Sequence, residues 1–416
     1  MQTGTPVPDA VEFGASPAHP ARPTVDGRNS ACNSVSTATR MLAVDGYSVV
    51  LGLAMTGQQR AEDELRQALS RLAPKGAEYE SFLANHGPMA AEAILRLDLG
   101  DHIEPWLEHY LPRLDDAPEP RGLLTEETWL DHLGDVRSAG DWQRLFEREL
   151  AEHDWQSVVR TWWPRLLPGL AASAAHGVIR TCHAVRTLLL TDSRDTDPLF
   201  IDELARGLGL WASRFHYLPG SGDVRGNLPP VPALAALPRL DRDVPGAGPG
   251  IVGRLDALVT RTDLPVALQL AALAEDPQAA LWSLAQAGSR VLAAREDAPI
   301  AFCHTVTTPA AVCMALPVLP DEVIRATVVT TWRMVGSIVA AFASPRDATE
   351  SQPPAADGID IGEIRRQLPH LAVEHGDEHV IKLTEAALRT HAATADITPL
   401  VAAERMRHRI PRLGVL

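Results

Sequence analysis

Cysteine and lysine are both scarce in this sequence. Only four cysteines occur, and none of them stands in a CxxC pair or in a spacing typical of a disulfide framework. We therefore expect a reduced, cytoplasmic protein. Only two of the 38 basic residues are lysines, Lys75 and Lys382, and the others are arginines. A GC-rich coding bias accounts for this shortage in general, but it does not explain why Lys382 stays a lysine.

Signals of several common function classes are also missing. The chain has no GxGxxG between a strand and a helix, no P-loop motif and no GxSxG motif. We therefore expect neither a nucleotide or flavin cofactor nor α/β-hydrolase chemistry. The net charge of −15 at pH 7 and the pI near 5.4 argue against nucleic acid or an anionic membrane surface as a partner.

Membrane and export signals are not apparent either. The first residues contain no apolar core of a signal peptide. The longest apolar stretch, residues 323–343, carries Arg325 and Arg333, so it falls short of the ~18 uncharged residues of a membrane span. We expect this stretch to form a buried helix, with no membrane partner.

The hydrophobic pattern predicts an all-α protein. Apolar residues recur at the helical spacing i, i+3, i+4 and i+7 over most of the chain. Examples are residues 60–72, 89–99, 142–153 and 177–190. Alternating runs of β-branched residues are absent. We expect one large multi-helix domain around a buried cavity, with few or no strands.

Proline and glycine set the predicted domain organisation. Residues 1–40 are predicted to be a flexible, Pro-rich lead-in, and residues 41–416 a single helical domain. Two Gly/Pro-rich loops are predicted inside this domain, near residues 217–250 and 344–360. The first of these loops contains too many glycines and prolines to favour regular secondary structure.

Two of the 15 histidines stand directly before predicted helices. His86 precedes Pro88 and an apolar helical run, and a helix N-terminus favours the neutral imidazole that binds metals or accepts protons. His304 lies in apolar sequence ahead of Pro309 and a predicted helix, so we expect it to be buried. A helix cap for His86 and a hydrogen-bonded core histidine for His304 are the structural alternatives.

A third segment carries a polar stripe on an otherwise apolar helix. At ~100° per residue, His176, Arg180 and His183 fall within one narrow arc. Such a stripe predicts the wall of a lined cavity, and a solvated helix face is the alternative.

The fourth segment places His375, His379 and Lys382 at i, i+4 and i+7. His375-x-x-Glu378-His379 matches the inverted zinc-peptidase motif H-x-x-E-H, in which two histidines bind zinc and the glutamate is the base. Gly376 within the motif weakens the required helix by about 1 kcal/mol relative to alanine. A zinc hydrolase and a plain charged helix face both stay open.

Together these segments resemble the questin oxidase family. The resemblance rests on Asn85-His86 before a helix, His176-Gly-Val-Ile, His304-Thr-Val-Thr, and His379-Val-Ile-Lys382, in this order over about residues 80–400. It implies an all-helical oxygenase that uses O₂ on anthraquinone-type or related aromatic polyketides, by Baeyer–Villiger-like oxidation or C–C bond cleavage. It also implies a non-haem iron held by histidines, and a hydrophobic aromatic small molecule as the partner.

The resemblance leaves two versions of the chemistry open. This chain has Arg180 where fungal members carry a second histidine, and arginine cannot bind a metal. In the iron version His86, His176 and His304 bind the metal. His183 could then substitute for the missing histidine, and Lys382 could add an oxygen ligand if CO₂ carbamylates it.

In the metal-free version a histidine removes a phenolic proton from the substrate. Arg180 and Lys382 then stabilise the phenolate and the peroxide formed on the ring. The candidate catalytic set is His86, His176, Arg180, His183, His304 and Lys382. A non-catalytic helical protein that binds a hydrophobic polyketide is a third hypothesis.

Overall fold

The computed structural model describes residues 60–413, apart from 61, 81, 192–196, 242, 245–247, 249 and 344–359. Internal contacts divide the chain into two compact units, Met1–Gly52 and Leu53–Leu416. All described residues belong to the second unit. The predicted lead-in at residues 1–40 and almost all of the predicted loop near 344–360 lie outside the described residues.

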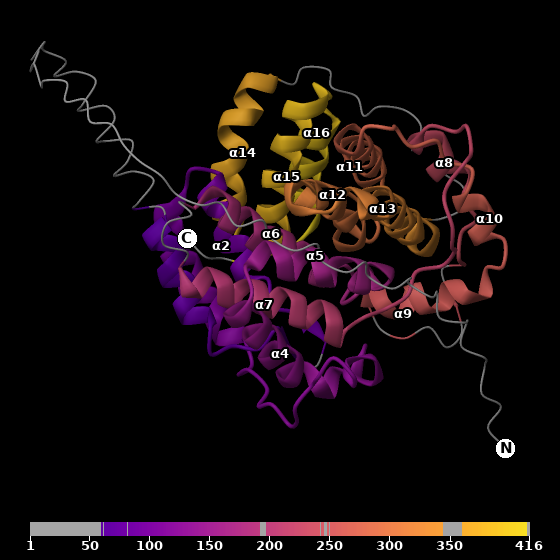
Figure 1. The fold of residues 1–416 in the computed structure, drawn as a ribbon. Helices are drawn as coiled ribbons and strands as arrows, with labels where there is room; N and C mark the ends of the chain where they lie inside the picture. Colours follow the sequence, from indigo (N-terminus) through magenta and orange to yellow (C-terminus); the bar gives the residue numbers. More distant parts are fainter. Residues whose placement is uncertain are drawn as a thin grey trace, which may run out of the picture. The chain divides into compact units, whose positions relative to one another are not determined.

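The prediction of an all-α fold is confirmed (Figure 1). Strands in the described residues are limited to β1 (Glu78–Tyr79) and β2 (Leu83–Ala84), which form a short antiparallel hairpin. Residues 62–72 are helical. The α-helices are α2 (Gly87–Arg96), α3 (Ile103–Tyr110), α4 (Ala139–Glu152), α5 (Trp155–Leu166), α6 (His176–Leu190), α7 (Pro198–Ser213), α8 (Pro230–Ala236), α9 (Gly250–Ala257), α10 (Leu264–Leu268), α11 (Pro277–Ala294), α12 (Pro299–Ala315), α13 (Asp321–Phe342), α14 (Ile361–His375), α15 (Glu378–Thr394) and α16 (Thr398–Arg409). The short 3-10 helices are η1 (Gly100–His102), η2 (Leu111–Arg113), η3 (Trp129–His132), η4 (Val136–Ser138), η5 (Leu167–Gly169), η6 (Leu258–Thr260) and η7 (Leu316–Val318).

Aspartate caps begin many of the helices. In each case the carboxylate accepts a hydrogen bond from a backbone N–H of the first turn, which would otherwise have no partner. These caps are Asp154, Asp197, Asp276, Asp360 and Asp377.

Two predictions based on proline are wrong. The Gly/Pro-rich stretch near 217–250 contains helix α8, because a proline at a first helical position suits the fixed φ of its ring. His304 does not precede a helix, because α12 begins at Pro299 and continues through Pro309. Pro309 lacks an N–H, but a buried helix that packs well on its neighbours tolerates this loss.

Helices α2, α6, α12 and α15 form a closed ring of contacts near the middle of the folded unit. α2 packs on α6 and α15, and α12 packs on the same two helices (Figure 1). α12 is buried from Ala301 to Ala315, which explains why its sequence is apolar on nearly every side. Polar side chains on this ring therefore lie in the core.

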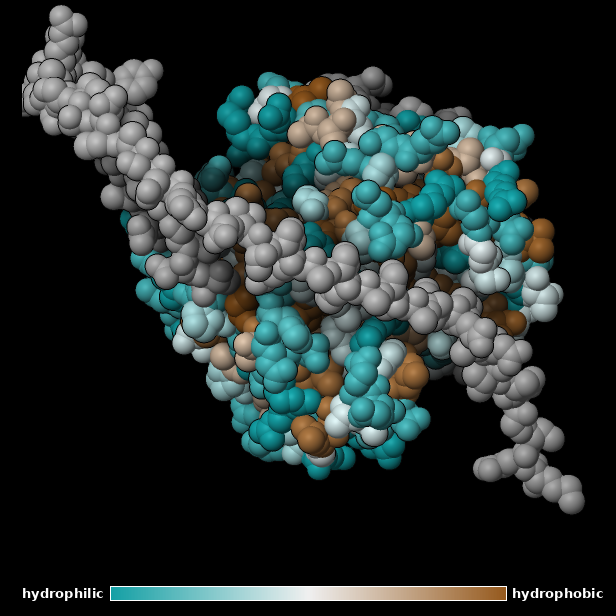
Figure 2. Space-filling view, in the orientation of Figure 1, coloured by the Kyte–Doolittle hydropathy of each residue, from teal (hydrophilic) through white to brown (hydrophobic). Residues whose placement is uncertain are grey.

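Two helical segments are long and apolar enough to cross a membrane by length and composition alone, Pro299–Val318 and Asp321–Phe342. Their most apolar windows are 83% and 78% buried against the rest of the chain, as expected for core helices. Hydrophilic side chains occupy much of the face shown in Figure 2, with smaller apolar areas between them.

Candidate metal centre

The ring of four helices brings four histidines and one lysine together. His86 is the N-cap of α2, His176 is the first residue of α6, and His304 lies in the middle of α12. His379 and Lys382 come from the first turns of α15. None of the five side chains belongs to a residue that is more than 8% exposed. These residues are called the histidine centre below.

The imidazole nitrogens of the centre approach one another closely. His176 Nε2 lies 2.7 Å from His86 Nε2 and 3.0 Å from His304 Nε2. The ring of His379 lies 4.5 Å, centroid to centroid, from that of His86. One ring nitrogen each from His86, His176 and His379 fall within 4.8 Å of one another, close enough to hold a single metal ion.

Backbone carbonyls fix the tautomers of two of these rings. His176 Nδ1 lies 2.5 Å from the carbonyl oxygen of Ser173, and His304 Nδ1 lies 2.8 Å from that of Ile300. A carbonyl only accepts, so each Nδ1 carries the proton and each Nε2 has a lone pair. A proton on His86 Nε2 can satisfy its contact with His176, but the facing lone pairs of His176 and His304 still lack a cation between them.

Burial keeps these imidazoles neutral. Desolvation, followed by the charge of Lys382, lowers the pKa of His86 well below its ordinary value. Desolvation does the same to His176, and it lowers the pKa of His304 to about 3. A proton is therefore a poor candidate for the missing cation at neutral pH. A metal ion is a good one, since metal-bound histidines typically donate their other N–H to a carbonyl or carboxylate.

The backbone before His176 adopts an uncommon conformation. Ser173, Ala174 and Ala175 all have positive φ, at 48°, 58° and 73°. Each left-handed residue costs roughly 1–2 kcal/mol, and such strain is typical of functional sites. The turn directs the Ser173 carbonyl back to the His176 ring. Gly177 then allows α6 to approach α7, because a Cβ there would lie 2.6 Å from the Cα of Trp211.

A second set of contacts orients His86. The His86 N–H donates to Tyr110 Oη at 2.7 Å, which sets the start of α2. His86 Nδ1 has no hydrogen-bond partner, but Glu378 Oε1 lies 3.6 Å away. Arg113 Nη1 lies 3.4 Å from Glu378 Oε2, and Arg113 Nη2 donates to Tyr79 Oη. The buried Glu378 carboxylate is thus placed to accept from His86 when its Nε2 is a ligand.

Lys382 is a buried amine without an ion pair. It is 3% exposed, and no carboxylate of the described part of the chain lies within ion-pair distance of its amine. Desolvation lowers its pKa to about 8, although Cys303, Glu378 and Asp377 act in the opposite direction. A substantial fraction of the amine is therefore neutral near pH 8.

Arg180 and His183 lie outside the histidine centre. Arg180 forms a two-pronged ion pair with Glu203 of α7, at 2.6 and 2.7 Å. His183 Nδ1 lies 2.8 Å from Glu92 Oε2 of α2. Helical spacing places Arg180 and His183 in one arc with His176. In the structure, however, Arg180 and His183 each bind a carboxylate from a different neighbouring helix.

His183 belongs to a buried ion network on the same four helices. Arg186 donates to Glu92 and, at 2.5 Å, to Glu385 Oε1 of α15. Arg389 donates to Glu385 and to the carbonyl oxygen of Ala310 in α12. These side chains, Glu92, His183, Arg186, Glu385 and Arg389, are called the ion network below.

The H-x-x-E-H motif does not form a zinc site in the expected way. α14 ends at His375, Gly376 has a φ of 81°, and α15 starts at Glu378, so the motif spans two helices. His375 Nε2 lies 3.2 Å from the carbonyl oxygen of Ile410, away from His379. Gly376, which lies inside the motif, separates α14 from α15, so the motif does not lie on a single helix.

Sequence reasoning left His379 out of the metal set because it paired this residue with His375. The spacing from His379 to Lys382 is i, i+3 on one helix, so both side chains share a face. Once Lys382 was a candidate, His379 could have been added on this basis.

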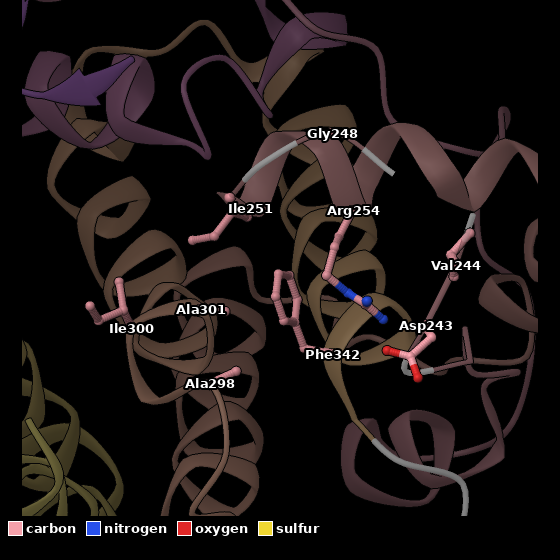
Figure 3. Close-up of a pocket in the computed structure, with 10 residues that line it drawn as sticks. Asp243, Val244, Gly248, Ile251, Arg254, Ala298, Ile300, Ala301 and Phe342 are labelled. Carbon is pink, nitrogen blue, oxygen red and sulfur yellow. The ribbon is translucent and has the colours of Figure 1, made fainter. Parts of the chain in front are cut away.

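An open groove of about 730 Å³ lies one turn of α12 from His304. Figure 3 shows Phe342, Arg254 and Asp243 on one side of it and Ile300 and Ala301 of α12 on the other. The groove is mainly aliphatic and aromatic, a lining that suits an apolar ligand.

The centre offers neutral imidazoles and an amine of lowered pKa as donors. Imidazole suits divalent iron, zinc, copper and nickel. No protein-family model matches this chain, and no curated protein matches it.

Proposed function

We propose that this chain is an oxygenase of the questin oxidase type that holds a non-haem metal ion on its buried histidines. The observation that carries the proposal is the pair of facing lone pairs on His176 Nε2 and His304 Nε2, 3.0 Å apart on two buried, neutral imidazoles. Two unprotonated nitrogens at this distance repel each other, and a cation bound by both removes that repulsion. In this proposal His86, His176, His304 and His379 hold the ion.

Iron is the metal that the proposal assigns. Iron(II) supplies the one-electron chemistry that lets O₂ react with an electron-rich aromatic ring. The family resemblance supports this choice, because it implies a histidine-bound iron. The residues that carry the resemblance are also those that form the centre. The proposed substrate is an anthraquinone-type or related aromatic polyketide, and the reaction is a Baeyer–Villiger-like oxidation or an oxidative C–C cleavage.

Lys382 would complete the donor set as a carbamate. Its neutral amine attacks CO₂, a C–N bond forms and one proton leaves, which gives a carboxylate on the side chain. The lowered pKa of about 8 favours this step, since only the neutral amine reacts. Arginine cannot undergo it, which gives a reason for a lysine at this position.

The position of Arg180 favours the iron version over the metal-free version. A metal-free oxygenase needs a cation beside the phenolate and the peroxide on the ring. Arg180 is instead paired with Glu203, and His183 with Glu92. Lys382 alone would remain for that role.

The experiment combines metal analysis with oxygen uptake. Protein purified without chelator is analysed for iron and zinc, then given 1,8-dihydroxyanthraquinone with and without O₂. The expected result is about one iron per chain and turnover that needs O₂. Unchanged turnover under strict anaerobiosis, with no added oxidant, would falsify the oxygenase proposal.

The same experiment separates the other two hypotheses. A helical binding protein retains the anthraquinone without product and without oxygen uptake. A zinc hydrolase contains about one zinc per chain that is lost in His375→Ala but kept in His304→Ala. The proposed centre predicts the reverse for iron.

A further inference from the structure

A second pocket, of about 250 Å³, lies outside the histidine centre. Its charged lining comes from Arg180 of α6, from Arg206 and Arg214 in and directly after α7, and from the carboxylates of Glu78, Asp115 and Asp116. None of the five residues of the histidine centre lines it. All of its lining residues belong to the described part of the chain.

Arg180 lines this pocket and has one buried donor without a hydrogen-bond partner. Its side chain is buried, with the residue 2% exposed, and Nε and Nη2 both donate to Glu203. Nη1 is buried and has no hydrogen-bond partner. Glu203 is not among the residues that line this pocket, and Nη1 is the guanidinium nitrogen that the pair with Glu203 leaves without an acceptor. A buried donor without an acceptor is costly, and a ligand oxygen would remove that cost.

The charges around the pocket favour an uncharged ligand. Each arginine already has a carboxylate partner: Glu203 for Arg180, Asp202 for Arg206 and Glu78 for Arg214. An additional anion would meet Asp115 and Asp116, and a cation would meet three guanidinium groups. A carbonyl oxygen can accept from Arg180 Nη1, and a hydroxyl can donate to a carboxylate of the lining.

We propose that this pocket is a binding site for a small, uncharged hydroxy-carbonyl compound, such as a hydroxyaryl ketone. Its volume lies just below the ~300–1,000 Å³ of typical small-molecule pockets, so the ligand is small. The site also touches the turn before the histidine centre. Glu78 of the lining accepts from Ser173 Oγ at 3.1 Å, and the Ser173 carbonyl accepts from His176 Nδ1.

The test measures binding of 4-hydroxyacetophenone to the metal-free full chain at pH 6.5 by isothermal titration calorimetry. The expected result is saturable binding, weaker by about tenfold for acetophenone, which lacks the hydroxyl, and for the anion 4-hydroxybenzoate. Because no metal is present, this outcome does not depend on the proposed oxygenase activity. Absence of saturable binding, or tighter binding of the anion, would overturn the proposal.

Two variants locate the binding. Arg180→Lys keeps the charge beside Glu203 but removes Nη1, and it should weaken binding about tenfold or more. Val136→Trp fills the pocket from a side chain that is 42% exposed, and it should abolish binding without affecting folding. The matched control is Val259→Trp, an exposed valine that is also in a 3-10 helix, and it should bind normally. Equal binding by the two tryptophan variants places the ligand elsewhere and refutes the site.

Discussion

The histidine centre and the ion network are two buried polar clusters on the same four helices, and they differ in how completely their polar atoms are paired. In the ion network, Glu92 pairs with Arg96 and Arg186, and Glu385 pairs with Arg186 and Arg389. In the histidine centre, two ring nitrogens face each other with no proton between them, and His86 Nδ1 and His379 Nδ1 have no hydrogen-bond partner.

This difference distinguishes a structural cluster from a binding site. A saturated network lowers the energy of the folded chain as it stands. A cluster of neutral donors that converge on one point leaves interaction energy to be gained from a ligand. Residue type alone does not separate the two, because both clusters combine histidine with basic side chains on α6 and α15.

The largest expected effect is on the histidine centre. His176→Ala removes the ring whose Nε2 contacts both His86 and His304, so metal content should fall from about one ion per chain to nearly none. Metal should also no longer raise the melting temperature of the variant. The exposed His153→Ala is the control and should bind normally. Full metal content in His176→Ala would place the ion elsewhere.

The ion network should respond in stability and not in metal binding. Arg186→Met leaves Glu92 and Glu385 without their shared cation, and it should lower the free energy of unfolding by about 3–5 kcal/mol. Urea denaturation measures this change. Arg366→Met, which removes a surface pair with Glu363, should cost no more than ~1 kcal/mol. If the two variants were equally stable, the network would not be the structural cluster described above.

The two lysines allow a matched comparison. Lys382→Arg keeps a positive charge but cannot form a carbamate, so turnover should fall about 10–100-fold. Lys75→Arg should have no effect, because Lys75 only pairs with Asp116 near the surface. Initial rates of oxygen uptake give both values, and mass spectrometry of wild type in ¹³CO₂ tests for the carbamate. Wild-type rates in Lys382→Arg would remove the lysine from the mechanism.

A pH dependence separates the buried histidines from the carboxylates of the ion network in the metal-free protein. The pKa of His304 is lowered from 6.5 to about 3, so the unfolded chain binds more protons between these values and stability falls as pH drops below 6.5. The slope should be about 1.4 kcal/mol per pH unit for each such histidine. The pKa of Glu385 is lowered from 4.5 to about 2, so its stabilising contribution is lost only below pH 4.5. Urea denaturation at pH 7, 6 and 5 should therefore report the histidines, and a flat profile would contradict their low pKa values.

The helical spacing of apolar residues was enough to predict the fold class and several helix ranges. His86 and His304 were marked by their place before predicted helices, and His176 by the polar stripe on an apolar helix. Lys382 was marked by its helical spacing from His375 and His379. Proline was a poor guide to boundaries, since α5, α12 and α14 each contain one. The packing of the whole helix outweighs one missing backbone hydrogen bond.

The ion-pair partners of Arg180 and His183 could not be predicted from the sequence of their own helix. Helical geometry places them in one arc with His176, but their partners, Glu203 and Glu92, lie on other helices. Which acid reaches which base depends on how α2 and α7 pack on α6. That information is carried by the tertiary contacts and not by local periodicity.

The spread of the histidine centre along the chain has a consequence for when it can form. Its two closest nitrogen contacts join residues that are 90 and 128 positions apart. Contacts of such long sequence separation form late in folding, because closing the loop costs entropy before the contact stabilises it. A nascent chain that already exposes α2 and α6 still lacks α15, and with it His379 and Lys382. The centre can therefore be assembled only after α15 has been synthesised, so binding of the proposed metal ion would have to wait for that late stage.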